Sequence, residues 1–264
     1  MIQSALHLSI FGWAVVAIFM AALWGIQLFT QNAAIVDFGW ALSLVFLASF
    51  YAIRGDAGLW RGLLMAGMVG VWGLRLAFYL LFTRVIGQNE EGRYQELRAH
   101  WGARVQSRFF MFFQAQGLLN IVLAVPFLVV ALNPRRALSP LEYAGAVLWA
   151  VAFLGEVLAD AQLARFKSHP LNRGRVCGRG LWRFSRHPNY FFEWLIWVSY
   201  ALFALASPHG YLGLISPALI LFFLLKVTGI PATEAQALRS KGEAYRRYQQ
   251  TTSVFIPWFP RRTA

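Results

Sequence analysis

The chain has 264 residues, of which 58% are hydrophobic, 16% aromatic and only 13% charged, and its mean hydropathy is +0.52. This balance excludes an ordinary soluble domain, in which about a quarter of the residues are charged. The formal net charge of +13 attracts anionic headgroups. Because the cations are divided among loops beside apolar runs, nucleic acid is not expected as a partner. The composition predicts an integral membrane protein.

Seven apolar runs follow one another along the chain, each near the roughly 20 residues that a helix needs to cross a bilayer. Lipid offers backbone amides no partner, and the runs lack the period-two alternation of barrel strands, so we expect α-helices. The pattern predicts an all-α integral membrane fold, a seven-transmembrane helix bundle that forms one domain over residues 1–264. The predicted spans are residues 8–29, 34–53, 63–82, 110–132, 143–163, 190–206 and 212–227.

The basic residues predict an orientation for this bundle. Of the 24 Lys and Arg residues, 18 lie in segments 84–108, 165–186 and 239–262, which alternate with the spans so as to share one side. The positive-inside rule assigns that side to the cytoplasm, with the N-terminus outside and the C-terminus inside. The first run lacks a basic leader and a cleavage site and is interpreted as a retained span. We therefore expect a membrane protein whose basic loops face the cytoplasm.

A small set of polar side chains falls at membrane depth, where such groups are costly and usually functional. Pairing between helices is the structural alternative for each of them. Two of the pairs are four residues apart, a spacing that places both members on one helix face. Pro188 precedes the second pair and is a typical helix-start signal. The set consists of Asp37, Arg75, the pair Glu156 and Asp160, and the pair Asn189 and Glu193.

The segment between the fifth and sixth predicted spans carries seven cations. Arginines bind phosphates through charge-assisted hydrogen bonds, while carboxylates and carboxamides accept from ribose hydroxyls or amide groups. The combination favours a nucleotide cofactor. Arg179, Arg183 and Arg186 are expected to meet phosphates or headgroups, and His187 is expected to cap the helix or to contact phosphate. Cys177, the single cysteine, is interpreted as a buried thiol, and no metal-binding motif is found.

Several motifs together resemble the integral membrane steroid 5α-reductase family, in particular its bacterial branch of DUF1295 type. They are IVDFGW, WGLRL with the following EEGRYQELRAHW, GLWRFSRHPNYFFEW and GEAYRRYQQTTSVFIPWFP, and they cover nearly the whole chain. The resemblance implies a seven-helix bundle whose cavity opens to the cytoplasm and holds NADPH. It also implies reduction of the carbon–carbon double bond of an α,β-unsaturated ketone, a steroid-like or other lipid substrate that enters from the bilayer.

Site residues are carried over at the matching positions of this chain. Asp37 matches, within about one residue, a catalytic glutamate of the steroid reductases. Trp72 stands where the family has a catalytic tyrosine, and with Phe78 it is expected to line the substrate chamber. Lys167 replaces a phosphate-binding arginine, and Glu156 stands where an asparagine is expected. The implied cofactor contacts are Arg75, Tyr79, Asp160, Lys167, Arg175, Asn189 and Glu193.

Two other functions remain open at this point. The stretch RHPNY followed by a glutamate is similar to motifs of membrane methyltransferases that use S-adenosylmethionine, a cofactor without phosphates. A transporter or membrane scaffold could use the buried charges as a path or as structural pairs. No inverted repeat or pair of broken helices supports transport, and the many loop arginines fit a phosphate-bearing cofactor better.

Overall fold

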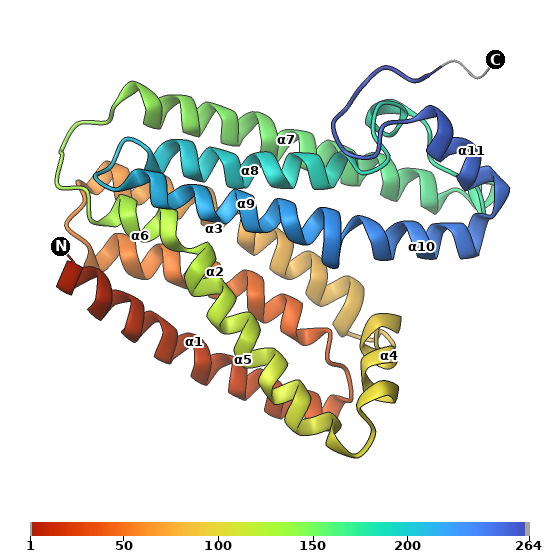
Figure 1. The fold of residues 1–264 in the computed structure, drawn as a ribbon, viewed down its shortest axis with the longest axis horizontal. Coiled ribbons are helices and arrows are strands. Elements are labelled where there is room, and N and C mark those ends of the chain that lie inside the picture. The colour runs from red at the N-terminus through yellow and green to blue at the C-terminus, as the bar shows by residue number, and fades with distance from the viewer. Residues whose placement is uncertain (1, 262–264) are drawn as a thin grey trace. The chain divides into compact units, whose positions relative to one another are not determined.

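A computed structural model describes residues 2–261, and Arg262 of the basic tail lies outside them. Regular structure in this range is helical (Figure 1), and the β-pairing among these residues is an isolated bridge between Ser185 and Ser253. The chain groups into two compact units. The first consists of Met1–Glu142 and Phe203–Ile215, and the second of Tyr143–Leu202 and Ser216–Ala264.

The first unit contains three long apolar helices followed by a polar helix and a bent pair. Asn32 holds the turn that precedes the second helix, since its Oδ1 accepts a hydrogen bond of 3.1 Å from the amide of Ala34, the residue just before that helix. Asp37 lies in the first turn of that helix, as predicted. The elements are α1 (Ile2–Thr30), α2 (Ile35–Arg54), α3 (Leu59–Leu80) with a π-helical turn (Leu81–Val85), α4 (Gly92–Trp101), α5 (Val105–Leu123) and α6 (Val125–Ala131).

Glycines allow the first three helices to approach closely. A Cβ on Gly39 would lie 2.2 Å from Cδ1 of Leu23 on α1, and a Cβ on Gly73 of α3 would lie 2.5 Å from Cγ2 of Val45 on α2. Small residues at helix contacts are typical of membrane bundles, in which packing rather than water exclusion holds helices together. These two positions therefore fix the spacing of α1, α2 and α3.

The predicted span 110–132 is a broken helix rather than a continuous one. α5 and α6 meet at Ala124 and are bent by 43°. Pro126 stands in the first turn of α6, where a missing amide proton costs nothing but the preceding helix cannot continue undisturbed. The predicted span therefore corresponds to a bent pair of helices, a break that the sequence analysis did not predict.

A buried ion pair closes the end of the first unit opposite to α4. The guanidinium of Arg61 bonds the Glu142 carboxylate, its Nη2 lying 3.3 Å from Oε2, and it also donates to the carbonyls of Arg135 and Ala137. Arg61 and Glu142 are each 1% exposed. Each charge therefore depends on the other for compensation, which joins the start of α3 to the start of α7.

The second unit is built on two facing helices and a basic end region. Gly155 of α7 meets the Phe192 ring of α8 so closely that a Cβ there would lie 2.4 Å from Cδ1 of that ring. Trp149 donates to the Tyr200 hydroxyl at 3.2 Å across the same helix pair. The elements are α7 (Pro140–Ser168), 3₁₀ turns (Pro170–Asn172 and Gly180–Arg183), α8 (Pro188–Ala204), α9 (Ile215–Phe222) with a π-helical turn (Phe223–Val227), α10 (Ile230–Lys241) and α11 (Glu243–Thr251).

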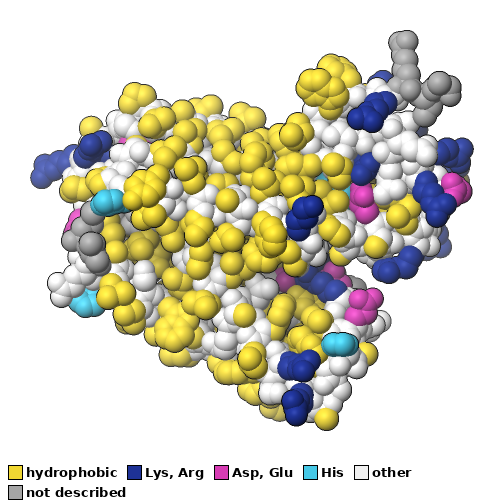
Figure 2. Space-filling model, viewed as in Figure 1, with side chains coloured by type: hydrophobic (Ala, Val, Ile, Leu, Met, Phe, Trp, Pro, Cys, Tyr) yellow, Lys and Arg dark blue, Asp and Glu magenta, His cyan; other side chains and the backbone are white. Residues whose placement is uncertain are grey.

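The membrane-spanning character of the chain rests on length and apolar composition. Within residues 2–261, five helices are long and apolar enough to cross a membrane, or six if the bent pair counts as one span. Their outward faces carry large apolar side chains such as Ile18 and Phe29, which are 72% and 90% exposed, and Figure 2 shows such side chains covering the visible face of the helices. The predicted span that is not among these six is the sixth in chain order, residues 190–206, which corresponds to α8, a helix of 17 residues.

Candidate functional site

The first group of predicted site residues lies where α7 and α8 face each other in the second unit. α8 begins at Pro188, as the sequence predicts. The next residue, Asn189, donates from Nδ2 to Oδ1 of Asp160 on α7 at 3.3 Å. Glu193 follows one turn along α8 and is half-buried, as are Asp160 and Asn189. Two carboxylates and a carboxamide are thus gathered at the mouth of an apolar helix pair.

The loop that connects α7 to α8 folds back onto α7. Gln162 accepts the Leu181 amide at 2.9 Å, and the Trp182 indole donates to the Ala159 carbonyl at 2.9 Å. Gly180 has a φ of +59°, and a Cβ there would lie 2.4 Å from the Gln162 side chain, so this turn requires glycine. The loop is therefore held in place.

Lys167, in the last turn of α7, and Arg175, on the loop, were both predicted to bind the cofactor and are both exposed. Exposed cations near a carboxylate cluster remain available to a soluble anion. Cys177 lies in the same segment and is 6% exposed. Burial raises the pKa of its thiol, and the neighbouring Arg179 only partly offsets this effect. The prediction that Cys177 is a buried thiol is confirmed.

A glutamate that the sequence analysis did not single out organises the basic end of the second unit. Oε1 of Glu234 on α10 lies 2.6 Å from Nε of Arg186 and 3.2 Å from Nε2 of His187, and Oε2 accepts from Gln249 at 2.9 Å. Tyr245 of α11 also donates to Oε1, at 3.4 Å. The side chain is only 15% exposed. One carboxylate thus joins the start of α8, α10 and α11.

This cluster changes the expected roles of two residues. Arg186 was expected to meet phosphates or headgroups, but besides Glu234 it bonds the carbonyls of Gln249 and Thr252 at 2.7 and 3.1 Å. His187 directly precedes α8 and its carbonyl accepts the Phe191 amide at 3.1 Å, so it takes the expected cap position. Its ring, however, contacts Glu234 and stacks on Tyr190 at 5.4 Å. A signal was present in the sequence, because Glu234 is the only acidic residue between Glu193 and Glu243.

Asp37, the predicted catalytic acid, is at the centre of a second polar cluster, in the first unit. Its Oδ1 accepts from the Tyr94 hydroxyl at 2.9 Å, and its Oδ2 contacts Arg93 and, at 3.5 Å, Arg84. Glu91 contacts both arginines, at 3.0 and 3.3 Å. Both carboxylate oxygens are therefore engaged by donors of neighbouring side chains. Asp37 is therefore a hydrogen-bond acceptor here, and the hydroxyl beside it belongs to Tyr94.

The remaining predicted residues lie on α3 of the first unit. Trp72 is fully buried and packs edge-on against Trp40, with ring centroids 6.1 Å apart. Arg75 is half-buried, and Tyr79 is 53% exposed. Phe78 is 50% exposed. Trp72, Arg75 and Tyr79 follow one another at intervals of three and four residues and so form one stripe along the helix.

These observations define the class of protein: an all-helical integral membrane protein with polar clusters at the ends of apolar helices. The chain belongs to the DUF1295 family, described as a protein of unknown function, which matches residues 23–252. It is also similar to the uncharacterized protein C594.04c of Schizosaccharomyces pombe, with 28% identity over 267 residues that cover 89% of this chain and 75% of the relative. No solved structure matches the chain.

Proposed function

We propose that the protein is an NADPH-dependent reductase of the carbon–carbon double bond of an apolar α,β-unsaturated ketone, a 3-oxo-Δ4-steroid-like or other lipid from the bilayer. The observation that carries this proposal is the hydrogen bond of 3.3 Å between Asn189 and Asp160, with Glu193 one turn along α8. Such a group suits the ribose hydroxyls and the amide of a dinucleotide. Polar groups at the mouth of an apolar helix pair are otherwise costly.

The donor set fits the proposed cofactor. Asp160, Asn189 and Glu193 would hold its sugar and amide groups. Lys167 and Arg175, which are exposed, would hold its phosphates. Arg75 and Tyr79 complete the proposed cofactor contacts, and the preference for NADPH over NADH comes from the family resemblance alone.

The first unit supplies the proposed acid. When bound, NADPH supplies a hydride to the β-carbon of the enone. Negative charge then develops on the ketone oxygen, where one hydrogen-bond donor lowers the barrier by about 2.7–4 kcal/mol. In the free protein the Tyr94 hydroxyl donates its one proton to Asp37 at 2.9 Å. With Asp37 holding it in place, this hydroxyl is proposed to turn that proton to the ketone oxygen when substrate binds, and a proton taken from water at the α-carbon completes the reduction. Trp72 and Phe78 are proposed to line the substrate chamber.

The proposed setting is a bundle of seven spans in the bacterial inner membrane, with α8 added to the six apolar spans counted above. The basic ends of both units would lie in the cytoplasm, where the cofactor is dissolved, and the N-terminus would lie outside. The excess of Lys and Arg on the loops of one side supports this orientation.

A cofactor titration tests the proposal. The 11 tryptophans would transfer excitation to a bound nicotinamide, so the signal is followed in detergent with NADPH and with NADH. We expect saturable NADPH binding that Arg175→Gln weakens about 10- to 100-fold, the range for a charge-assisted hydrogen bond. Arg239→Gln, which removes an equally exposed cation from α10, is the matched control and should leave the affinity unchanged.

Competition with S-adenosylhomocysteine separates the proposal from the alternatives. Binding of this compound in place of NADPH would support the methyltransferase function. If neither compound binds, the reductase proposal fails and the polar clusters are better explained by transport or by helix packing.

A further inference from the structure

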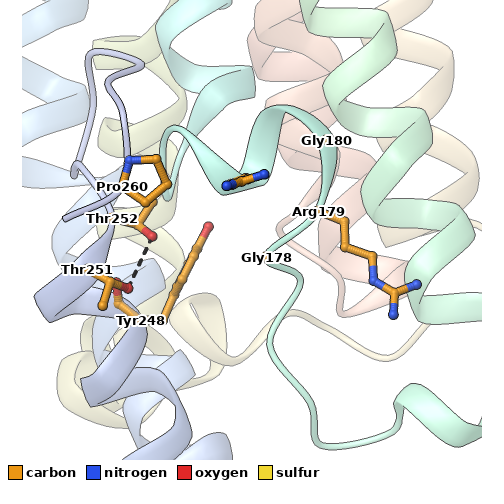
Figure 3. Close-up of a pocket in the computed structure, with 8 residues that line it drawn as sticks. Gly178, Arg179, Gly180, Tyr248, Thr251, Thr252 and Pro260 are labelled. Atoms are coloured by element: carbon orange, nitrogen blue, oxygen red, sulfur yellow. Dashed lines mark hydrogen bonds between the residues drawn. The ribbon is translucent and has the colours of Figure 1, made fainter. Parts of the chain in front are cut away.

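A pocket of about 530 Å³ lies in the second unit, apart from the Asp160–Asn189 group. One wall is the loop segment before α8, which contributes two glycines and two arginines. The other wall is α11 and the tail that follows it, and Figure 3 shows Tyr248, Thr251, Thr252 and Pro260 facing the loop from that side. The side chains that line it are Arg179, Arg183, Tyr248, Thr251, Thr252 and Pro260.

The pocket is electropositive and has no internal counterion. Arg179 and Arg183 are exposed, neither forms an ion pair with a carboxylate of residues 2–261, and no acidic residue is among the lining side chains. Arg186, three residues further on, differs because Glu234 neutralises it at 2.6 Å. The first two arginines are therefore available to an external anion. The Thr252 hydroxyl, 3.5 Å from that of Thr251, adds a neutral donor, whereas the Thr251 hydroxyl donates to the Arg247 carbonyl of its own helix at 3.2 Å.

Backbone hydrogen bonds hold the two walls together. The amide of Arg186 donates to the Ser253 carbonyl at 2.8 Å, and the amide of Trp258 donates to the Phe184 carbonyl at 2.9 Å. The Tyr248 hydroxyl donates to the carbonyls of Trp182 and Ser185. Burial raises the pKa of Tyr248, so this hydroxyl keeps its proton. A preformed pocket loses little freedom when a ligand binds.

The tail beside the pocket exposes large apolar side chains. Ile256, Trp258 and Phe259 are 60%, 69% and 77% exposed, and Pro260, the next residue, lines the pocket. Figure 2 shows a separate group of hydrophobic side chains over the tail, beside Lys and Arg. Exposed aromatics next to basic residues are typical of the membrane interface, where a ring is half in lipid and half in water. The same unit contains the apolar helices α7 and α9, so we expect the tail to lie close to the membrane surface.

We propose that this pocket binds the phosphate of an anionic phospholipid headgroup, with Arg183 as its main cation and Trp258 and Phe259 seated in the surrounding interface. Arg179 lines the pocket, but its side chain extends from the loop away from the α11 wall (Figure 3) and adds positive charge from the loop. The ligand is a phosphodiester carried by a lipid of the same membrane. A soluble phosphate offers the same chemistry, and the experiment below separates the two sources. The proposal does not depend on the reductase function, because none of the lining residues belongs to the proposed cofactor or catalytic set.

The test counts lipids bound to the full-length protein by native mass spectrometry in a neutral detergent. Phosphatidylglycerol and phosphatidylcholine are titrated separately. We expect one tight phosphatidylglycerol site, which the double variant Arg179→Gln/Arg183→Gln weakens about tenfold or more. The matched variant Arg173→Gln/Arg239→Gln removes two exposed cations of the same unit outside the pocket and should bind the lipid as the parent protein does.

A second arm adds inorganic phosphate or NADPH as competitor. The proposal predicts that neither displaces the lipid, since neither offers a lipid chain to the aromatic tail. The variant Trp258→Ala/Phe259→Ala should weaken phosphatidylglycerol binding while keeping its preference over phosphatidylcholine. Equal binding of the two lipids, or full binding by the pocket variant, would overturn the proposal. So would arginine-dependent binding of inorganic phosphate without lipid binding. The two proposals can fail separately. If the protein does not bind NADPH in the fluorescence titration, the reductase proposal fails, but the lipid counts from native mass spectrometry still test the phospholipid site.

Discussion

Nε of Arg186 donates to Oε1 of Glu234 at 2.6 Å. Because Glu234 lies on α10 and also contacts His187, this carboxylate joins α10 to the two residues that precede α8. The Glu234 and Arg186 side chains are only 15% and 11% exposed. Removing one partner of such a pair leaves the other charge uncompensated, which costs more than the pair itself contributes. The basic end of the second unit therefore depends on a single carboxylate.

We predict that Glu234→Gln lowers the free energy of unfolding by about 1–3 kcal/mol, the cost of leaving a partly buried polar group unsatisfied. Thermal unfolding in detergent measures this loss. Glu243→Gln is a matched control, because Glu243 pairs with Arg246 at 2.6 Å on the open surface, where both side chains are more than half exposed, and surface pairs contribute little. Equal stability of the two variants would contradict the role assigned to Glu234.

Asn189 provides a second prediction. Replacement by leucine keeps the size of the side chain but removes the amide that donates to Asp160. If Asp160, Asn189 and Glu193 bind NADPH, Asn189→Leu should raise the dissociation constant of NADPH about tenfold or more, because the carboxamide's hydrogen bonds are lost from the binding site. Tryptophan-to-nicotinamide energy transfer measures the change. An unaltered dissociation constant in a well-folded variant would remove Asn189 from the proposed cofactor set.

The roles of Tyr94 and Asp37 can be tested separately, because the hydroxyl belongs to Tyr94 and the carboxylate that positions it belongs to Asp37. Tyr94→Phe removes only the hydroxyl, so turnover should fall about 10²- to 10³-fold, as for the loss of one oxyanion donor, while NADPH affinity is unchanged. Asp37→Asn should lower turnover as well, since the carboxylate that positions the Tyr94 hydroxyl is lost. The measurement is kcat on an enone lipid, with the cofactor dissociation constant as the parallel readout. Near-normal turnover of both variants would exclude this cluster from catalysis.

Cys177 yields a prediction about pH. Burial raises the pKa of its thiol, and the thiolate is the species that alkylating reagents attack. At any given pH the folded protein therefore holds less thiolate than the unfolded chain, and labelling should be slow near neutrality and increase only as the pH rises above the ordinary range of a thiol. Iodoacetamide labelling, followed by mass and compared with the denatured chain, tests this. Rapid labelling of folded protein at neutral pH would mean that the neighbouring cations outweigh burial.

The orientation of the chain in the membrane can be tested in a variant that lacks Cys177. Cys177→Ser leaves a chain without cysteine, into which single thiols are introduced at Arg136 and Arg247, both exposed. The charge distribution predicts that an impermeant thiol reagent added to intact cells labels position 136 but not position 247. The reverse pattern would place the basic loops outside and contradict the proposed access of NADPH.

Local patterns in the sequence predicted the helix start at Pro188 and the shared face of Asn189 and Glu193, because each depends on a few neighbouring residues. The break between α5 and α6 was missed, since the apolar run around Pro126 is continuous. The polar helices α4, α10 and α11 were also missed, because a search for membrane spans selects apolar runs. The contact of Glu234 with His187 joins residues 47 positions apart, and no local pattern reports such a pairing.

The buried bond between Arg61 and Glu142 joins residues that are 81 positions apart in the chain. During synthesis, Arg61 emerges long before its partner, so the start of α3 carries an uncompensated cation until the start of α7 has been made. Only then can both charges leave water together. We therefore expect the start of α3 to pack in its final position only after the start of α7 has been synthesised.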